Sequence, residues 1–415
     1  MSQARPTEAP SARPGELARP APLWTRGFVL LCLVTGLCYA SHQLVTVTLP
    51  LFVQGLGGSP VIAGLVFTSF SITSFILRPM LGRLSDKWSA RGTLLSGAAI
   101  LGATGLCFIV PSVWIAFITS AVRGIGWGAF STAAAVGVAL IAPQSRRGEA
   151  SGYFSVATTA ASAFAPALAL SLLDSTGNFT LVFVMAGVAG LAAATAVKFM
   201  PKFGTGTNTF RETIALTRED MTLSAFIDRP VLLASALLVC VTMAAPVTFA
   251  FVPLHAKAVG VENIGFYFVA SGLASVVARL SLGRMLDRQS RGFWLVAGYT
   301  ALIAAYATFL QAHTLEVFML AAVLNALGFS LTQPTLMAFA IDRAERGRMG
   351  RAMATFSMFY RVGEGIGAPV AGALIVLFGY SGMYIGAMTY AAAGIVVAAL
   401  NWRTVGKPIM QPAGA

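Results

Sequence analysis

The stretch "GRLSDKWSARG" occupies Gly82–Gly92, and a similar stretch, "GRMLDRQSRG", occupies Gly283–Gly292. Both are rich in charge, although only 10 % of the 415 residues are Asp, Glu, Lys or Arg. The glycines that open the two stretches are 201 positions apart, and so are Asp86 and Asp287. A cluster of charge that occurs twice in register in so apolar a chain predicts two repeated halves.

The composition places this chain in a membrane. Hydrophobic residues make up 57 % of it, and the mean hydropathy is +0.78. Soluble domains are typically about 45–50 % apolar and about 25 % charged. The formal net charge is +13, but the cations stand in short loops between apolar runs. This pattern indicates membrane orientation rather than nucleic-acid binding, so we expect an all-α membrane protein whose partner is the lipid bilayer.

Apolar runs of spanning length, about 17–25 residues, predict twelve transmembrane helices in two sets of six. The first set lies near 27–50, 60–82, 92–110, 112–141, 149–172 and 179–199. The second set lies near 230–253, 263–283, 293–311, 315–340, 350–376 and 380–402. The run from Gly27 to Pro50 is longer than a signal-peptide core of about 7–15 residues, which favours a first spanning helix.

The same pass along the chain predicts its division into segments. Residues 1–26 are rich in Pro, Ala and Arg and are expected to be a disordered cytoplasmic tail. Residues 27–199 and 230–403 form the two six-helix bundles, and 404–415 form a second cytoplasmic tail. The polar stretch 200–229 is a cytoplasmic linker, either an interfacial helix or a flexible tether.

The distribution of cations predicts the orientation in the membrane. With the N-terminus inside, 23 of the 28 Lys and Arg residues fall in cytoplasmic segments, and only Lys257 falls in an outside loop. The other four, Arg78, Arg123, Arg279 and Arg361, lie within spans. Because cytoplasmic loops carry the excess of Lys and Arg, we expect a multi-pass protein of the cytoplasmic (inner) membrane with both termini cytoplasmic.

Three motifs carry a resemblance to the major facilitator superfamily of secondary transporters over about residues 27–403. The loop after the second span has Gly82, Leu84, Asp86, Lys87 and Arg91 at the positions of the family signature, with Trp88 and Ser89 where a Gly is usual. The fourth span has Arg123, Gly126 and Gly128, as in the family's arginine motif. The fifth span has Ala161, Ala165, Pro166 and Ala169, similar to the antiporter motif with Ala at each Gly.

The resemblance implies two six-helix bundles around a central cavity and a chain that works as a monomer. It also implies a cytoplasmic gate that braces the halves in the outward-open state. The gate residues are Gly82, Arg83, Asp86, Lys87, Arg91, Gly283, Arg284, Asp287 and Arg288. Drug exporters of the superfamily often have an acid in the first span, and this chain has none there, which argues against cationic drugs as cargo.

Polar residues inside spans are costly and mark the first places to search for a site. Arg361 and Glu364 lie three positions apart on one face of the eleventh span, near mid-membrane. They form either a cargo and proton site or a structural ion pair. For Arg123 the resemblance implies proton coupling, and a packing strut is the alternative. Further cavity candidates, or packing hydrogen bonds, are Tyr39, His42, Gln43, Asn325 and Gln333.

These observations predict a secondary transporter that moves a small organic molecule together with protons. Efflux by alternating access is the first hypothesis, and import of a sugar, organic acid or other metabolite is the second. A membrane sensor or assembly protein that moves nothing is the third. The sequence has no phosphate-binding G-x-x-x-x-G-K-(S/T) loop, no H-E-x-x-H and no G-x-S-x-G, so we expect neither an enzyme nor a cofactor or metal site.

Overall fold

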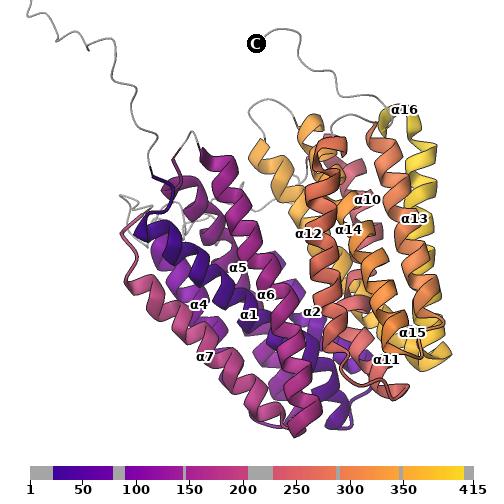
Figure 1. Cartoon of the computed structure of the whole chain (residues 1–415), viewed down its shortest axis with the longest axis horizontal. Coiled ribbons are helices and arrows are strands. Elements are labelled where there is room, and N and C mark those ends of the chain that lie inside the picture. Colours follow the sequence, from indigo (N-terminus) through magenta and orange to yellow (C-terminus); the bar gives the residue numbers. More distant parts are fainter. Residues whose placement is uncertain are drawn as a thin grey trace, which may run out of the picture.

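The computed structural model describes residues 22–77, 89–143, 146–203, 228–286, 290–344 and 349–405. These residues are almost entirely helical, which confirms the predicted all-α fold (Figure 1). The helices of the first half are α1 (Arg26–Gly55), α2 (Pro60–Ile76), α4 (Ala90–Cys107), α5 (Val113–Ile141), α6 (Arg147–Thr176) and α7 (Phe179–Lys198).

The second half begins with a span built from four consecutive pieces. These are η3 (Arg229–Val231), α10 (Leu232–Thr242), the π-helical η4 (Val247–Phe251) and α11 (Val252–Ala258). There follow α12 (Gly265–Leu286), α13 (Arg291–Phe309), α14 (Leu315–Arg343), α15 (Met349–Leu400) and the short α16 (Trp402–Val405). Within α15, Gly379 has a φ of 70°, a conformation that favours glycine, and there the chain turns from one span into the next.

Twelve spans result within the described residues, as the sequence predicts. Eight helical segments are long and apolar enough to cross a membrane, and the two arms of α15 count as one of them. The helices α2, α4 and α12 complete the set. The first span continues to Gly55, beyond the predicted end at Pro50, because a proline inside a spanning helix costs only local hydrogen bonds.

Several helices begin where the sequence supplies a side-chain cap. Thr25, Ser59, Ser89, Asn178 and Ser290 each accept a hydrogen bond from the backbone amide three residues later. Such caps satisfy amides that have no partner inside the helix. They fix the starts of α1, α2, α4, α7 and α13, which is why the predicted starts lie within a few residues of the observed ones.

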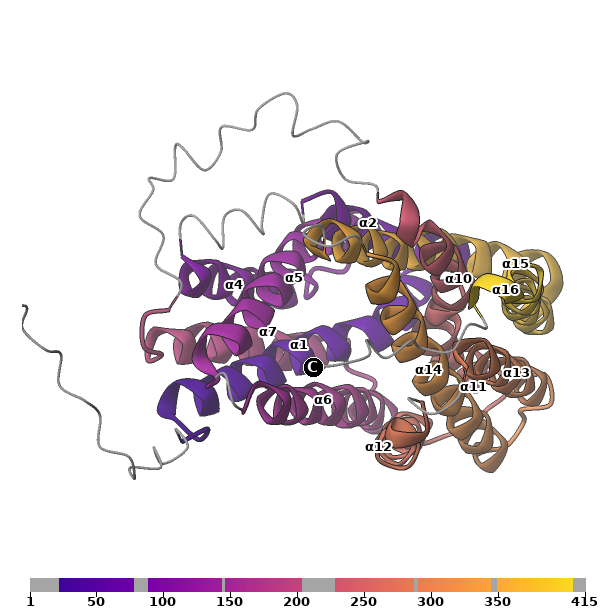
Figure 2. The ribbon, with the colours of Figure 1, turned by 90° about the horizontal axis from the view of Figure 1, so that it is seen from above.

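The spans pack as two bundles, which lie side by side in Figure 2. In the first bundle, α4 packs on α5 and α7, α1 packs on α6 and α7, and α2 packs on α5. In the second, α13 packs on α14 and α15, α10 packs on α15, and α12 packs on α14. The main contacts between the bundles are α2 with α15 and α6 with α12.

The contacts between the bundles repeat the internal symmetry of the sequence. A methyl group at Gly64 of α2 would lie 2.5 Å from the carbonyl oxygen of Ala368 in α15. One at Gly265 of α12 would lie 2.8 Å from the carbonyl oxygen of Ala167 in α6. Gly265 and Ala368 follow Gly64 and Ala167 by 201 positions each. Small residues let backbones approach closely, so each half contributes one glycine and one alanine to an equivalent contact.

These contacts lie near the starts of α2 and α12, at the end of the molecule remote from both termini. In Figure 1, α11 lies at this lower end, whereas α16 lies at the upper end. Thr68 adds a hydrogen bond of 2.6 Å to the carbonyl oxygen of Gly365, again between α2 and α15. The bundles are therefore joined at the remote end.

Candidate functional site

A cavity of about 540 Å³ lies between the two bundles and is lined from both of them. Its wall includes side chains of α1, α2, α5 and α6 and of η4, α12, α14 and α15. Seven of the eight predicted site residues line it: Tyr39, His42, Gln43, Asn325, Gln333, Arg361 and Glu364. Polar residues that are scattered over three spans in the sequence thus converge on one space.

Arg361 and Glu364 form an ion pair in the cavity wall. Arg361 Nη1 lies 2.6 Å from Glu364 Oε2, and the two side chains are 11 % and 10 % exposed. Their spacing places them one turn apart on α15, as the sequence predicts. The Arg361 guanidinium also lies over the rings of Tyr360 at 5.5 Å and Phe70 at 5.9 Å. These rings lie against it at the wall, and its Nε has no hydrogen-bond partner in the part of the chain that the structure describes.

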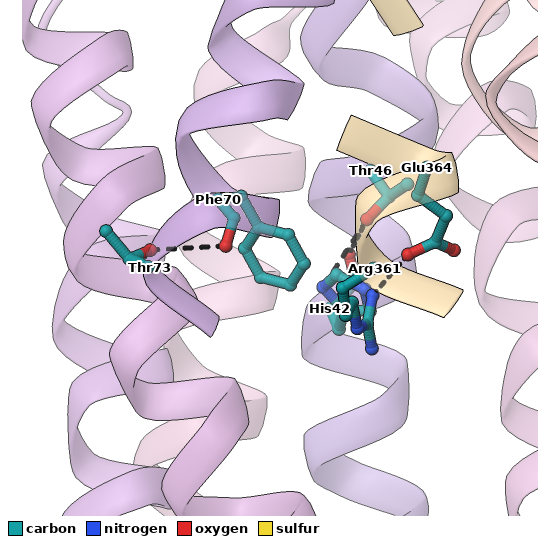
Figure 3. A network of polar contacts seen from close by, with 6 residues as sticks. All are labelled: His42, Thr46, Phe70, Thr73, Arg361 and Glu364. Carbon is teal, nitrogen blue, oxygen red and sulfur yellow. Dashed lines mark hydrogen bonds and ion pairs between the residues drawn. The ribbon is translucent and has the colours of Figure 1, made fainter. Parts of the chain in front are cut away.

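The side chain of His42 lies between the rings of Phe70 and Trp127. Figure 3 shows it with Phe70, Thr46 and the pair of Arg361 and Glu364. Its imidazole stacks on Phe70 with ring centroids 4.9 Å apart, and it lies 4.1 Å from the ring of Trp127. The hydroxyl of Thr46 donates to the His42 carbonyl oxygen at 2.8 Å. Phe70 contacts both His42 and Arg361, so it joins the polar residues of α1 to those of α15. Its own carbonyl accepts from Thr73 at 3.1 Å.

The other cavity candidates differ in exposure. Gln43 and Asn325 are buried, and the side-chain nitrogen of Asn325 makes no hydrogen bond to the described residues. Gln333 is exposed to the cavity. The ring of Tyr39 lies 4.9 Å from that of Trp127, with its edge toward the indole. Of these amides, that of Gln333 is therefore the most accessible to a ligand.

Arg123 is the predicted site residue that lies outside the cavity wall. It is 2 % exposed and donates to the carbonyl oxygens of Leu101 and Ser41, both at 2.7 Å. It also donates to the hydroxyls of Thr104 and Ser41, both at 3.0 Å. These four acceptors are neutral and belong to α4 and α1, so the contacts tie α5 to both helices. This geometry favours the packing strut.

The comparison with protein families decides the identity of the fold. The profile of the Major Facilitator Superfamily matches residues 31–315 and 258–413. The chain belongs to the major facilitator superfamily. It is therefore a transporter of small molecules and not an enzyme. Among the described residues, no group of three His, Cys, Asp or Glu side chains could hold a metal ion.

Individual relatives are distant but match over most of their length. An uncharacterized MFS-type transporter of Methanocaldococcus jannaschii is 23 % identical, with 80 % of this chain and 87 % of the relative covered. The staphylopine export protein of Staphylococcus aureus is 20 % identical, with 86 % and 91 % covered. A D-xylose-proton symporter shares the fold with a TM-score of 0.72 at 16 % identity, with 92 % of this chain and 99 % of that chain covered.

The gate motif of the superfamily falls mostly outside the described residues. This applies to Gly82, Arg83, Asp86, Lys87, Asp287 and Arg288. Gly283 and Arg284 belong to α12, and the side chain of Arg284 is also outside the described part. Arg91 donates to the carbonyl oxygens of Val197 at 3.1 Å and Lys198 at 2.7 Å, at the end of α7. A cation there complements the negative end of the helix dipole.

The antiporter-like motif of the superfamily lies on α6 beside the contact between the bundles. Ala165 is buried, and Pro166 lies inside α6 directly before Ala167, which meets Gly265. In α15, Pro369 directly follows Ala368, and its Cα would lie 2.7 Å from a methyl group at Gly64. The motif on α6 therefore lies next to the contact of Ala167 with Gly265.

Sequence reasoning missed much of the cavity wall of this superfamily member. Besides Tyr39 and Trp127, its aromatic residues are Phe67, Phe249, Phe268, Phe329, Phe356 and Tyr360. Hydroxyls come from Thr158, Thr159 and Ser162 of α6 and from Ser271 and Ser275 of α12. Apolar and hydroxyl side chains occur on every face of a spanning helix, so composition does not reveal which face lines a cavity. Arg279 also lines the cavity. The one indication of this in the sequence is that Arg279 is a cation within a predicted span.

Proposed function

We propose that this transporter exports a small organic molecule across the cytoplasmic membrane in exchange for protons, by alternating access. The main support is the ion pair of Arg361 and Glu364, 2.6 Å apart in the cavity wall. Ionisable residues in membrane spans are costly and mark substrate and proton pathways. Glu364 is the one carboxylate among the described residues that line the cavity, so we assign the proton to it.

Proton binding to Glu364 would change the contacts of both partners. The carboxylate is stabilised by the adjacent guanidinium, and a neutral acid would leave Arg361 without its counter-charge. A buried charge without a partner is destabilising by about 3–5 kcal/mol. Such a penalty is large enough to favour a different arrangement of the bundles. Protonation from one side and release to the other would then link proton movement to the change of access.

The direction of transport is supported by two observations. The staphylococcal relative is named an export protein, and the motif on α6 resembles that of antiporters. Separately, the bundles are joined at the end remote from the termini, a form in which cargo would bind from the side of the termini. Importers and exporters both pass through such a form. The excess of cations predicts that the side of the termini is the cytoplasm.

The rest of the proposal concerns organisation. We assign residues 27–199 and 230–403 to two bundles that move relative to each other, and residues 200–229 to the cytoplasmic linker between them. The cavity is lined from both bundles of one chain, so a single chain is sufficient for transport. The two termini would lie in the cytoplasm.

The proposal is tested by Glu364→Gln, which keeps the shape of the side chain and removes the exchangeable proton. The purified protein is reconstituted in proteoliposomes, and transport currents and uptake are recorded for a panel of organic acids, sugars and amines. We expect Glu364→Gln to abolish accumulation driven by a pH gradient and to retain exchange of cargo at equal pH. Glu316→Gln is the matched control, because Glu316 is an exposed acid in the first turn of α14.

Two outcomes would contradict this proposal. Accumulation at the wild-type level by the Glu364→Gln protein would remove the residue from coupling. Cargo that moves in the same direction as protons would instead make the protein an importer. The recordings distinguish the two, since the first concerns one variant and the second concerns the wild-type protein.

A further inference from the structure

The positive and negative charges of the described residues that line the cavity do not cancel. Among the described lining residues, Arg279 and Arg361 carry positive charge and Glu364 carries negative charge. Glu364 is paired with Arg361 at 2.6 Å, so these two neutralise each other. Arg279 remains as a surplus cation, and the imidazole of His42 adds no negative charge. A cationic ligand would therefore find no free carboxylate on the described wall.

Arg279 lies far from the end at which the bundles are joined. It is about 21 Å along α12 from Gly265, at about 1.5 Å per residue. Its side chain is exposed, and it donates to the hydroxyl of Thr159 in α6 at 3.3 Å. It forms no ion pair with a described residue. The hydroxyl is neutral and the bond is long, so most of the guanidinium's donors are available to a ligand.

A second hollow gives further access to Arg279. It has a volume of about 420 Å³, lies between α6 and α12, and shares Thr159 and Arg279 with the cavity. The acid that lines this hollow, Glu149, is paired with Arg146 at 2.8 Å. Arg279 thus lines both hollows, and the acid of the second hollow, Glu149, is already paired with Arg146.

The cavity wall also indicates the body of the ligand. Eight aromatic side chains line the cavity, among them Trp127, Phe268 and Phe356. Aromatic faces and edges bind flat apolar groups. An arginine fork binds carboxylate, sulfonate or phosphate through parallel hydrogen bonds. One molecule could make both kinds of contact if a negative group is attached to a flat apolar body.

We propose that the cavity binds organic anions with a flat apolar body and that Arg279 is the residue that selects negative charge. This inference rests on the proposed function only in taking the cavity as the cargo site. It is independent of Glu364 as the proton carrier. If Arg279 only holds α12 to α6 through Thr159, replacing it would not change the preference of the cavity for negatively charged ligands.

The test uses three naphthalene probes of similar size in nanodiscs that contain the purified protein. Naphthalene-2-sulfonate is an anion, 2-naphthyltrimethylammonium is a cation and 2-naphthylmethanol is neutral. Calorimetry is expected to give the sulfonate an affinity at least about tenfold higher than that of the ammonium probe. Arg279→Gln is expected to weaken sulfonate binding about tenfold and to leave the neutral probe unchanged. Arg279→Lys should retain part of the preference.

Arg403→Gln is the matched control, since it removes an exposed arginine of α16 outside the cavity. It should leave all three affinities unchanged. The proposal is overturned if the ammonium probe binds as tightly as the sulfonate or if no probe binds. It is also overturned if Arg279→Gln weakens all three equally. Anion preference together with intact coupling in Glu364→Gln would contradict only the proposed function, so the two failures are distinguishable.

Discussion

Arg123 and Glu364 show how the surroundings of a residue decide between function and packing. Both are ionisable residues inside spans, and the sequence selects both for the same reason. The structure separates them by their neighbours. Glu364 meets one cation at the wall of the cavity, whereas Arg123 donates to neutral oxygens of α1 and α4 and lies outside the wall. The first is the arrangement to which we assign the proton, and the second ties α5 to its neighbouring helices.

Replacing Arg123 therefore tests packing. Arg123→Met removes four hydrogen bonds and puts an apolar side chain of similar length in place of the arginine side chain. We expect the free energy of unfolding to fall by about 2 kcal/mol, since interhelical bonds in membranes contribute modestly and those to charged groups somewhat more. Reversible unfolding in dodecyl sulfate, followed by circular dichroism, measures this change. Arg403→Met, at an exposed position, should change it by less than about 0.5 kcal/mol. If the Arg123→Met protein keeps the full free energy of unfolding but loses transport, Arg123 would instead be assigned to proton coupling.

At the scale of elements, the close approaches of α2 to α15 and of α6 to α12 control the remote end. We expect Gly64→Ala and Gly265→Ala each to separate the bundles there, because the added methyl group meets a carbonyl oxygen at 2.5 Å or 2.8 Å. Spin labels at Gln54 and Glu262, in a protein without other cysteines, report the distance by pulsed electron paramagnetic resonance. In both variants the distribution of distances between the two labels should shift to longer values.

Gly36→Ala provides the control for these two variants. Gly36 is also a glycine of a spanning helix, but nothing lies within 4 Å of a methyl group placed there. The distances in Gly36→Ala should equal those in the parent protein. If Gly64→Ala and Gly265→Ala also leave the distances unchanged, these contacts do not hold the remote end closed.

The helices could be predicted from the sequence where neighbouring residues alone determine where a helix begins and ends. The hydrophobic runs and capping residues such as Ser59 and Asn178 set the helix starts within a few residues. The seventh span is broken at η4, directly after Pro246, whereas Pro334 stays inside α14 without a break, so a proline alone does not predict where a span is interrupted. The cavity wall was predictable only at its polar positions. Tertiary packing decides which apolar faces turn inward, and no local pattern records it.

At the scale of the whole molecule, the repeat of 201 positions explains why the contacts between bundles occur in equivalent pairs. Two halves with parallel topology are related by an axis along the membrane normal, so each interface places α2 or α12 against the fifth span of the other half. The two interfaces are therefore similar in chemistry. Relative movement of the halves changes both together, which is what alternating access requires.

The last prediction concerns the orientation of the whole molecule. Lys257 lies in α11 at the remote end, whereas Arg403 lies in α16 at the end of the termini. The excess of cations on the latter side predicts that it faces the cytoplasm. Lys257→Cys and Arg403→Cys are made in a protein without other cysteines and treated with a membrane-impermeant maleimide in intact cells. We expect labelling at position 257 at once and at position 403 only after permeabilisation. The reverse pattern would overturn the predicted orientation and place the end of α16 outside the cell.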